Sequence, residues 1–193
     1  MKNENNLFIC STYYHILISL IKALKNNEKN TILICNYWGD RTIFKNKDFI
    51  ERIINSNIFE KVYLFDLYDK YSRYININKK VNIIKKFFII KDIAEKVDIY
   101  FKKIGKIYIF NDTIPIGRAI NLKKIKYYLI EDGTDYFKKY NEEGINAKKN
   151  SYKLIKKKIF NLTDLGYSSN IINIEVNDKK NLFIENKNII EVP

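Results

Sequence analysis

The residues with the clearest potential for chemistry are two acids and a glycine, Glu131-Asp132-Gly133, in the stretch IKYYLIEDGTDYF (125–137). They directly follow a run of apolar and aromatic residues. A carboxylate in this position can act as a general base toward a substrate hydroxyl group. The same three residues can also form an ordinary turn after a strand, since Asp and Gly favour turns. The local pattern leaves both interpretations open.

The elements that would position these acids follow from the alternation of short apolar runs with longer amphipathic ones, which is typical of βαβ units. The expected strands are 6–10, 30–37, 61–67, 106–112 and 126–132. The expected helices are 11–27, 47–57, 79–103 and a short one that begins near Pro115, where a missing N–H does no harm. After Gly133 the pattern predicts a helix over 148–160, a loop over 161–180, and a strand or linker over 181–193.

These elements predict an α/β fold with an open, parallel, Rossmann-like sheet of about five to six strands. We expect residues 1–140 to form this domain and 141–193 to lead away from it toward a further domain. The helical period places Ile16, Leu20, Ala23 and Leu24 along one face of the first helix. The inward candidates are Phe49, Ile53 and Ile54 in the helix over 47–57, and Val81, Ile84, Phe88, Val97 and Phe101 in the helix over 79–103.

In such a sheet, ligands bind beyond the carboxyl ends of the strands. Those ends carry hydroxyl, acidic and aromatic residues, in the stretches CSTYYH, NYWGD, FDLYD, FND and EDGTD. None of them contains a dinucleotide fingerprint or a P-loop. Carboxylates that accept hydrogen bonds from hydroxyl groups, and rings that cover an apolar face, suit a sugar. The candidate binding residues at these ends are Ser11, Thr12, Tyr13, Asn111 and Asp112.

Each candidate has a structural alternative. Ser11 or Thr12 can cap the helix that follows, and Asn111-Asp112 can cap the helix that begins near Pro115. The Tyr13 ring can be a packing or rim residue. His15, the single histidine, is expected to be structural or partly exposed. No group of residues has the spacing of a metal site, so we expect no metal.

The formal net charge of +13 indicates a polyanionic partner or an anionic surface. The basic residues form no known nucleic-acid-binding signature, and the acidic sheet edge argues against nucleic acid. KLIKKKIF (153–160) suits a membrane surface, although a solvated helix face is the commoner origin of such a run. No signal peptide precedes the first strand, and no apolar run reaches the length of a membrane span. We therefore expect a cytoplasmic or peripheral protein.

Three stretches together resemble bacterial glycosyltransferase family 52, which includes lipooligosaccharide sialyltransferases and has motifs in common with bacterial polysialyltransferases. They are NLFICSTYYHILISLIKAL at the start, then IYIFND, then YYLIEDGTDYF, and the spacing between the three is part of the resemblance. Members of this family resemble GT-B enzymes, in which two Rossmann-like domains face a cleft. The family is marked by an acidic D/E-D/E-G motif in the N-terminal domain, which Glu131-Asp132-Gly133 match, and by His-Pro in the C-terminal domain.

The resemblance implies an inverting, metal-independent sialyltransferase of lipooligosaccharide or capsule synthesis, with no cofactor. Asp132 would be the general base toward a terminal galactose, and Glu131 would orient Asp132 or the acceptor. Gly133 and Thr134 would lie against the substrate. The partners implied are a glycan acceptor, a nucleotide-sugar donor and the anionic inner face of the bacterial inner membrane. The resemblance leaves open whether the chain forms a homodimer.

One feature departs from the family pattern. The only histidine, His15, is followed by Ile16, so the sequence contains no His-Pro. The resemblance therefore covers only the acceptor-binding half, about 1–140. CMP-sialic acid is expected to bind mainly the missing domain, and this chain alone is expected to be inactive. The alternatives are a UDP-hexose-dependent enzyme of the same family, and a non-catalytic module that binds glycans or a membrane surface.

Overall fold

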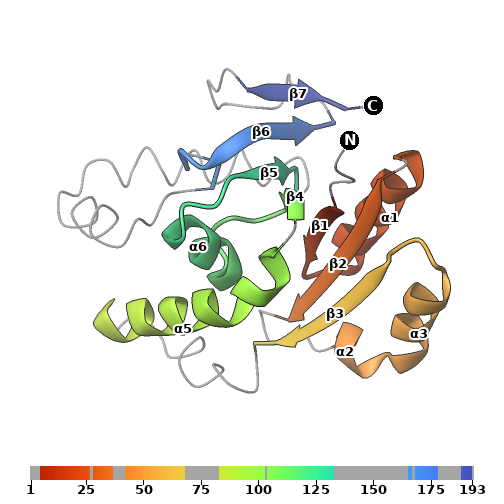
Figure 1. Ribbon diagram of the computed structural model, residues 1–193, viewed down its shortest axis with the longest axis horizontal. Helices are drawn as coiled ribbons and strands as arrows, with labels where there is room; N and C mark the ends of the chain where they lie inside the picture. The colour runs from red at the N-terminus through yellow and green to blue at the C-terminus, as the bar shows by residue number, and fades with distance from the viewer. Residues whose placement is uncertain are drawn as a thin grey trace. The chain divides into compact units, whose positions relative to one another are not determined.

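The protein has an α/β fold built on an open, all-parallel, Rossmann-like sheet (Figure 1). The computed structural model describes residues 5–26, 28–36, 42–67, 83–102, 104–132, 165–166, 168–177 and 188–192. Within them, seven strands run in the order β3-β2-β1-β4-β5-β6-β7. The chain adds β2 and β3 on one side of β1 and β4 on the other, so the strand order reverses between β1 and β4. Ligands of open α/β sheets commonly bind at such a reversal.

The described elements have the following bounds. The strands are β1 (Asn5–Cys10), β2 (Lys29–Asn36), β3 (Lys61–Asp66), β4 (Ile104–Ile109), β5 (Tyr127–Ile130), β6 (Ile171–Val176) and β7 (Ile189–Glu191). The helices are α1 (Tyr13–Lys25), α2 (Thr42–Lys45), α3 (Lys47–Asn55), α5 (Ile83–Phe101) and α6 (Pro115–Leu122).

The Rossmann-like parallel sheet predicted from the sequence is confirmed, but the strand number is seven rather than five to six. The additional β6 lies in 161–180, which the pattern predicted to be loop. Its sequence, IINIEV, mixes Asn and Glu with apolar residues, and Ile172 is 36% exposed. A strand of this kind lacks the continuous apolar run of a central parallel strand. The short β7 falls inside 181–193, where a strand was one of two expectations.

The predicted helices over 47–57 and 79–103 are confirmed by α3 and α5, and α6 begins with Pro115 in its first turn as expected. Among the side chains predicted to face inward, Ile16, Ala23, Ile53 and Val97 are buried. Three are instead exposed: Leu24 (67%), Ile54 (49%) and Phe88 (60%). Val81 and the side chain of Ile84 lie outside the described part of the chain. Helical period marks an apolar stripe, but it does not show which side of a largely apolar helix meets the sheet.

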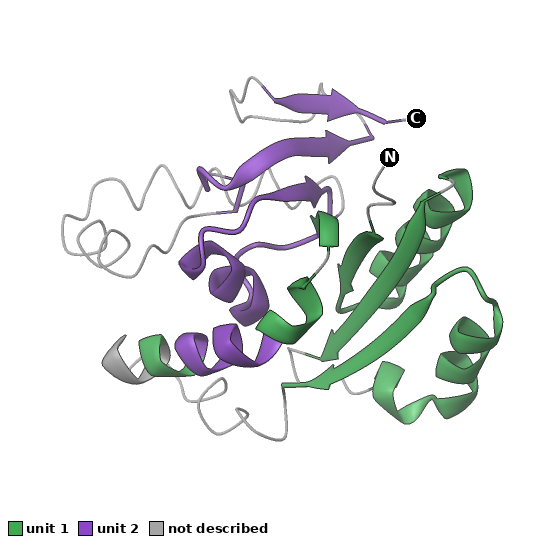
Figure 2. Ribbon diagram, in the orientation of Figure 1, with its two compact units in different colours: residues 1–89, 98–108 green, residues 90–97, 109–193 purple. Residues whose placement is uncertain are grey.

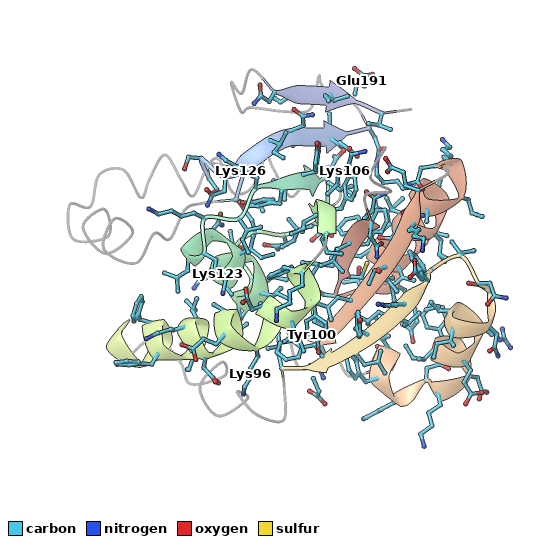
Figure 3. The ribbon with its side chains drawn as sticks, viewed as in Figure 1. Lys96, Tyr100, Lys106, Lys123, Lys126 and Glu191 are labelled. Atoms are coloured by element: carbon cyan, nitrogen blue, oxygen red, sulfur yellow. The ribbon has the colours of Figure 1, made fainter. Side chains whose placement is uncertain are left out.

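The chain divides into two compact units, which Figure 2 colours separately: residues 1–89 with 98–108, and residues 90–97 with 109–193. In unit 1, β1, β2 and β3 pair in parallel. The centres of β1 and β2 are apolar and fully buried. Tyr100 of α5, labelled in Figure 3, contacts the rings of Tyr63 and Phe65 on β3. In unit 2, β5, β6 and β7 pair in parallel.

Candidate functional site

The turn between β1 and α1 holds three of the predicted binding residues, and hydrogen bonds define its geometry. The Thr12 side chain accepts a hydrogen bond from the His15 backbone N–H at 3.1 Å and caps α1. The prediction that Ser11 or Thr12 caps this helix is therefore confirmed for Thr12. The Ser11 backbone N–H donates to Nδ1 of His15 at 3.1 Å. His15, only 3% exposed, is thus held as an acceptor within the turn.

Tyr13 is the candidate in this turn with the most open ring. Its side chain is 39% exposed, and its ring meets that of Phe49 on α3 edge-on, with centroids 4.8 Å apart. Tyr13 therefore packs against a neighbouring helix and still presents part of its ring to solvent. Both properties suit the rim of a site, and the role of Tyr13 in binding stays a prediction.

The ends of β2 and β3 are joined by side chains. Asn36 donates from its amide to a carboxylate oxygen of Asp66 at 2.7 Å, and the Leu67 backbone N–H donates to the Asn36 side-chain oxygen at 2.8 Å. Polar residues at these strand ends thus form hydrogen bonds with backbone and side-chain groups of the fold itself. Tyr37 and Trp38, the aromatic residues of the stretch NYWGD, lie outside the described residues.

In unit 2, Asp112 is almost completely buried, at 1% exposure. The Tyr127 hydroxyl donates to one carboxylate oxygen at 2.7 Å, and the Gly166 backbone N–H donates to the other at 3.4 Å. Burial raises the pKa of Asp112 to about 6, and the two hydrogen bonds and the positive charge of Arg118 act in the opposite direction. Burial also raises the pKa of Tyr127. The contacts give Asp112 a structural function, and its predicted function in binding remains untested.

A buried polar network surrounds this pair. The Ser168 hydroxyl and the Asn170 amide both donate to the Asn121 side-chain oxygen, at 2.5 and 3.2 Å. The Asn170 backbone oxygen accepts from the Tyr127 N–H at 3.1 Å. The network ties α6 to the start of β5 and to the turn before β6. Its members are far apart in the sequence and carry no motif, so sequence reasoning missed them.

Asn111 forms a local turn after β4. Its side-chain oxygen accepts from the Thr113 backbone N–H at 2.9 Å and from the Thr113 hydroxyl at 2.7 Å. The alternative prediction, that Asn111-Asp112 caps the helix near Pro115, is wrong. The N-cap of α6 is Ile114, and no side chain caps it. An Asn at this spacing favours a turn of its own.

The acid pair Glu131-Asp132 directly follows β5, and its two side chains have different surroundings. Glu131 is 3% exposed and accepts the Asn177 backbone N–H at 2.8 Å, while its own backbone N–H donates to the Glu175 carbonyl at 2.9 Å. Glu131 thereby joins the ends of β5 and β6. Asp132 is half-buried. Gly133 and Thr134 lie outside the described residues, so their predicted roles are untested.

Chemically, the half-buried Asp132 carboxylate is the member of the pair that could accept a proton or a hydrogen bond from a bound hydroxyl group.

In the described part of the chain, no group of three or more His, Cys, Asp or Glu could hold a metal ion. None of the described helices is long and apolar enough to cross a membrane. No protein-family model matches the sequence. No curated protein matches it either.

Proposed function

We propose that this chain is the acceptor-binding half of a glycosyltransferase, with Asp132 as the general base. The observation that carries the proposal is the acid pair after β5 of a Rossmann-like parallel sheet. Its first member is buried against the Asn177 N–H, and its second is half-buried. The class of enzyme comes from the resemblance to family 52, and with it the proposal that this domain is the N-terminal one of a GT-B enzyme.

In the proposed reaction, Asp132 removes the proton from an acceptor hydroxyl on a terminal galactose. The resulting oxygen attacks the anomeric carbon of sialic acid, and the bond from that carbon to the CMP phosphate oxygen breaks with inversion. CMP leaves with the electron pair of that bond. The Glu131 hydrogen bond to Asn177 fixes the backbone that carries Asp132. In this proposal a second domain binds the donor and stabilises the leaving phosphate. A UDP-hexose is the alternative donor.

The test is sugar transfer from CMP-sialic acid to a β-galactoside, measured for the full reading frame that encodes this chain. We expect Asp132→Asn to lower kcat by about 10²- to 10⁴-fold, the usual contribution of a general base. Acceptor binding should be retained. The matched control is Asp92→Asn on α5, where a partly exposed carboxylate pairs with Lys96 one helical turn away. Near-normal transfer by Asp132→Asn would exclude Asp132 as the base.

A second candidate function is a glycan-binding module without catalysis, for which the hydroxyl, acidic and aromatic residues at the strand ends would suffice. This function predicts galactoside binding and no transfer from any nucleotide sugar by the full reading frame. The transfer assay separates the two functions, and titration of the chain with lactose, followed by NMR, tests the galactoside binding that both of them predict.

The proposal also includes an anionic membrane as partner, at the inner face of the bacterial inner membrane. The net charge of +13 supports it, since each lysine or arginine close to anionic lipid contributes about 1 kcal/mol of attraction. Lipid-linked acceptors would be available at such a surface. The stretch 153–160, which suggested this partner, lies outside the described residues.

A further inference from the structure

The solvent face of α1 is apolar along the whole helix. Its buried side chains are His15, Ile16, Ser19 and Ala23, two of which are polar. Five further apolar and aromatic side chains lie on the opposite side, at helical spacing, and are exposed: Tyr13 (39%), Tyr14 (38%), Leu17 (54%), Ile21 (41%) and Leu24 (67%). An ordinary surface helix carries polar and charged residues on that side. A continuous exposed apolar face of this kind marks an interaction surface.

The charged side chains of α1 itself are all positive. The sequence of α1, YYHILISLIKALK, contains no acidic residue, and its last turn carries Lys22 and Lys25. Lys25 is exposed, at a helical position next to Ile21 and Leu24. Lys22 lies over the Tyr108 ring, 5.3 Å from its centroid. Large apolar side chains, flanking tyrosines and lysines without acids are the composition of helices that lie in a membrane interface.

We infer that this outward face of α1, formed by Tyr13, Tyr14, Leu17, Ile21 and Leu24, docks on an anionic membrane surface. A second copy of the chain is a poorer occupant, because a stable dimer buries about 20–30 residues on each side and this face offers five large side chains on one helix. Charge complementarity with anionic lipid favours the membrane, since the whole chain carries +13. The inference rests on the proposed membrane partner but not on the proposed chemistry.

The experiment is co-sedimentation of the full chain with vesicles, either of phosphatidylcholine alone or of equal parts of phosphatidylcholine and phosphatidylglycerol. The test variant is Leu17→Ser/Leu24→Ser. The control is Phe88→Ser/Ile99→Ser on α5, whose side chains are similarly exposed, at 60% and 63%. We expect the partition coefficient on anionic vesicles to fall at least about tenfold in the test variant and to stay unchanged in the control. Circular dichroism checks that each variant is folded.

A charge variant adds a second readout. Lys25→Gln should weaken binding to the anionic vesicles by about fivefold, because one lysine near anionic lipid contributes about 1 kcal/mol. It should leave binding to phosphatidylcholine unchanged. Asp132→Asn should bind both kinds of vesicle as the wild type does, so a failure of the proposed chemistry would not be mistaken for a failure of membrane docking.

Three outcomes would overturn the inference. Equal loss of binding in the test and control variants, or no loss in either, would mean that α1 is not the contact. No binding of the wild type to anionic vesicles would exclude the membrane as occupant. Concentration-dependent self-association of the wild type that Leu17→Ser/Leu24→Ser abolishes, without vesicle binding, would assign the face to a second copy of the chain.

Discussion

At the scale of single residues, the burial of Asp112 gives the chain a measurable dependence on pH. Its pKa is raised from an ordinary 3.8 to about 6, chiefly because burial disfavours the charged carboxylate. The hydrogen bonds from Tyr127 and Gly166 reduce this effect without cancelling it. Between these two values the folded chain binds more protons at Asp112 than the unfolded chain does, so protonation of this group favours the folded state.

We therefore predict that the contribution of Asp112 to the free energy of unfolding is greatest below about pH 4. It should fall as the pH rises through about 6, by an amount on the order of 3 kcal/mol. Urea unfolding of wild type and Asp112→Asn across this range tests it, because the net charge affects both proteins alike. The difference between their unfolding free energies should change with pH in the stated direction. Parallel curves would contradict the prediction.

Glu131 offers a second test, of its structural function. Glu131→Ala leaves the Asn177 backbone N–H without its side-chain acceptor, and we expect a loss of about 1–2 kcal/mol in the free energy of unfolding. Glu131→Gln keeps an acceptor oxygen and should lose less. Denaturant unfolding of both variants measures this. Unchanged stability in Glu131→Ala would mean that the contact does not help to hold β5 and β6 together.

The sequence predicted the acid pair because carboxylates that end an apolar run are visible by inspection. It could not predict which of them the fold uses internally. Glu131 receives its hydrogen bond from Asn177, and Asp112 receives one from Tyr127, from positions 46 and 15 residues away. Such pairings depend on the register of neighbouring strands, which residue type and local spacing do not encode.

At the scale of elements, α6 approaches the preceding turn so closely that only glycine fits at position 117. A Cβ atom there would lie 2.5 Å from the Asp112 Cα and 2.7 Å from its carbonyl carbon and oxygen. In an open helix, Gly→Ala would stabilise by about 1 kcal/mol. Here we expect Gly117→Ala to lower the free energy of unfolding by about 1–3 kcal/mol, because backbone atoms must move. Thermal unfolding measures the sign, and a stabilised variant would contradict the close approach.

Hydrophobic periodicity was sufficient to predict α3, α5, the start of α6 and the first five strands. It failed where an element is short or mixed in character. The four-residue α2 is barely longer than one helical turn, and β6 mixes polar and apolar side chains, so its segment was predicted to be loop. In α1 the predicted face is correct for Ile16 and Ala23, which are buried, and wrong for Leu24, which faces solvent, because apolar residues occupy both sides of the helix.

At the scale of the whole molecule, the positive charge is spread over many elements. The lysines labelled in Figure 3 come from α5, β4, the end of α6 and the segment before β5. Three ion pairs in the described part of the chain are Lys29–Glu60, Lys96–Asp92 and Lys106–Glu28. Partly exposed pairs of this kind contribute little stability. A charge spread in this way attracts the chain to an anionic surface, whereas the apolar face of α1 would determine how it lies there.

Salt separates these two contributions to membrane binding. At about 1 M ionic strength the Debye length falls to about 3 Å, so the attraction of dispersed lysines for anionic lipid is largely screened, while contact of Leu17, Ile21 and Leu24 with acyl chains persists. Vesicle binding by the wild type should therefore fall with salt to a plateau, and Leu17→Ser/Leu24→Ser should fall to near zero. Co-sedimentation over a salt series measures both curves.

Binding of duplex DNA by charge alone would instead fall linearly on logarithmic axes, with a slope of about 0.9 per neutralised phosphate, and would reach no plateau. If the wild type and the variant gave parallel curves on vesicles, both without a plateau, charge alone would hold the chain at the membrane. A plateau in the wild type alone would mean that α1 itself enters the membrane interface. High salt screens the electrostatic attraction to anionic lipid, which is the same in the wild type and the variant, and leaves the apolar contact that only the wild type makes.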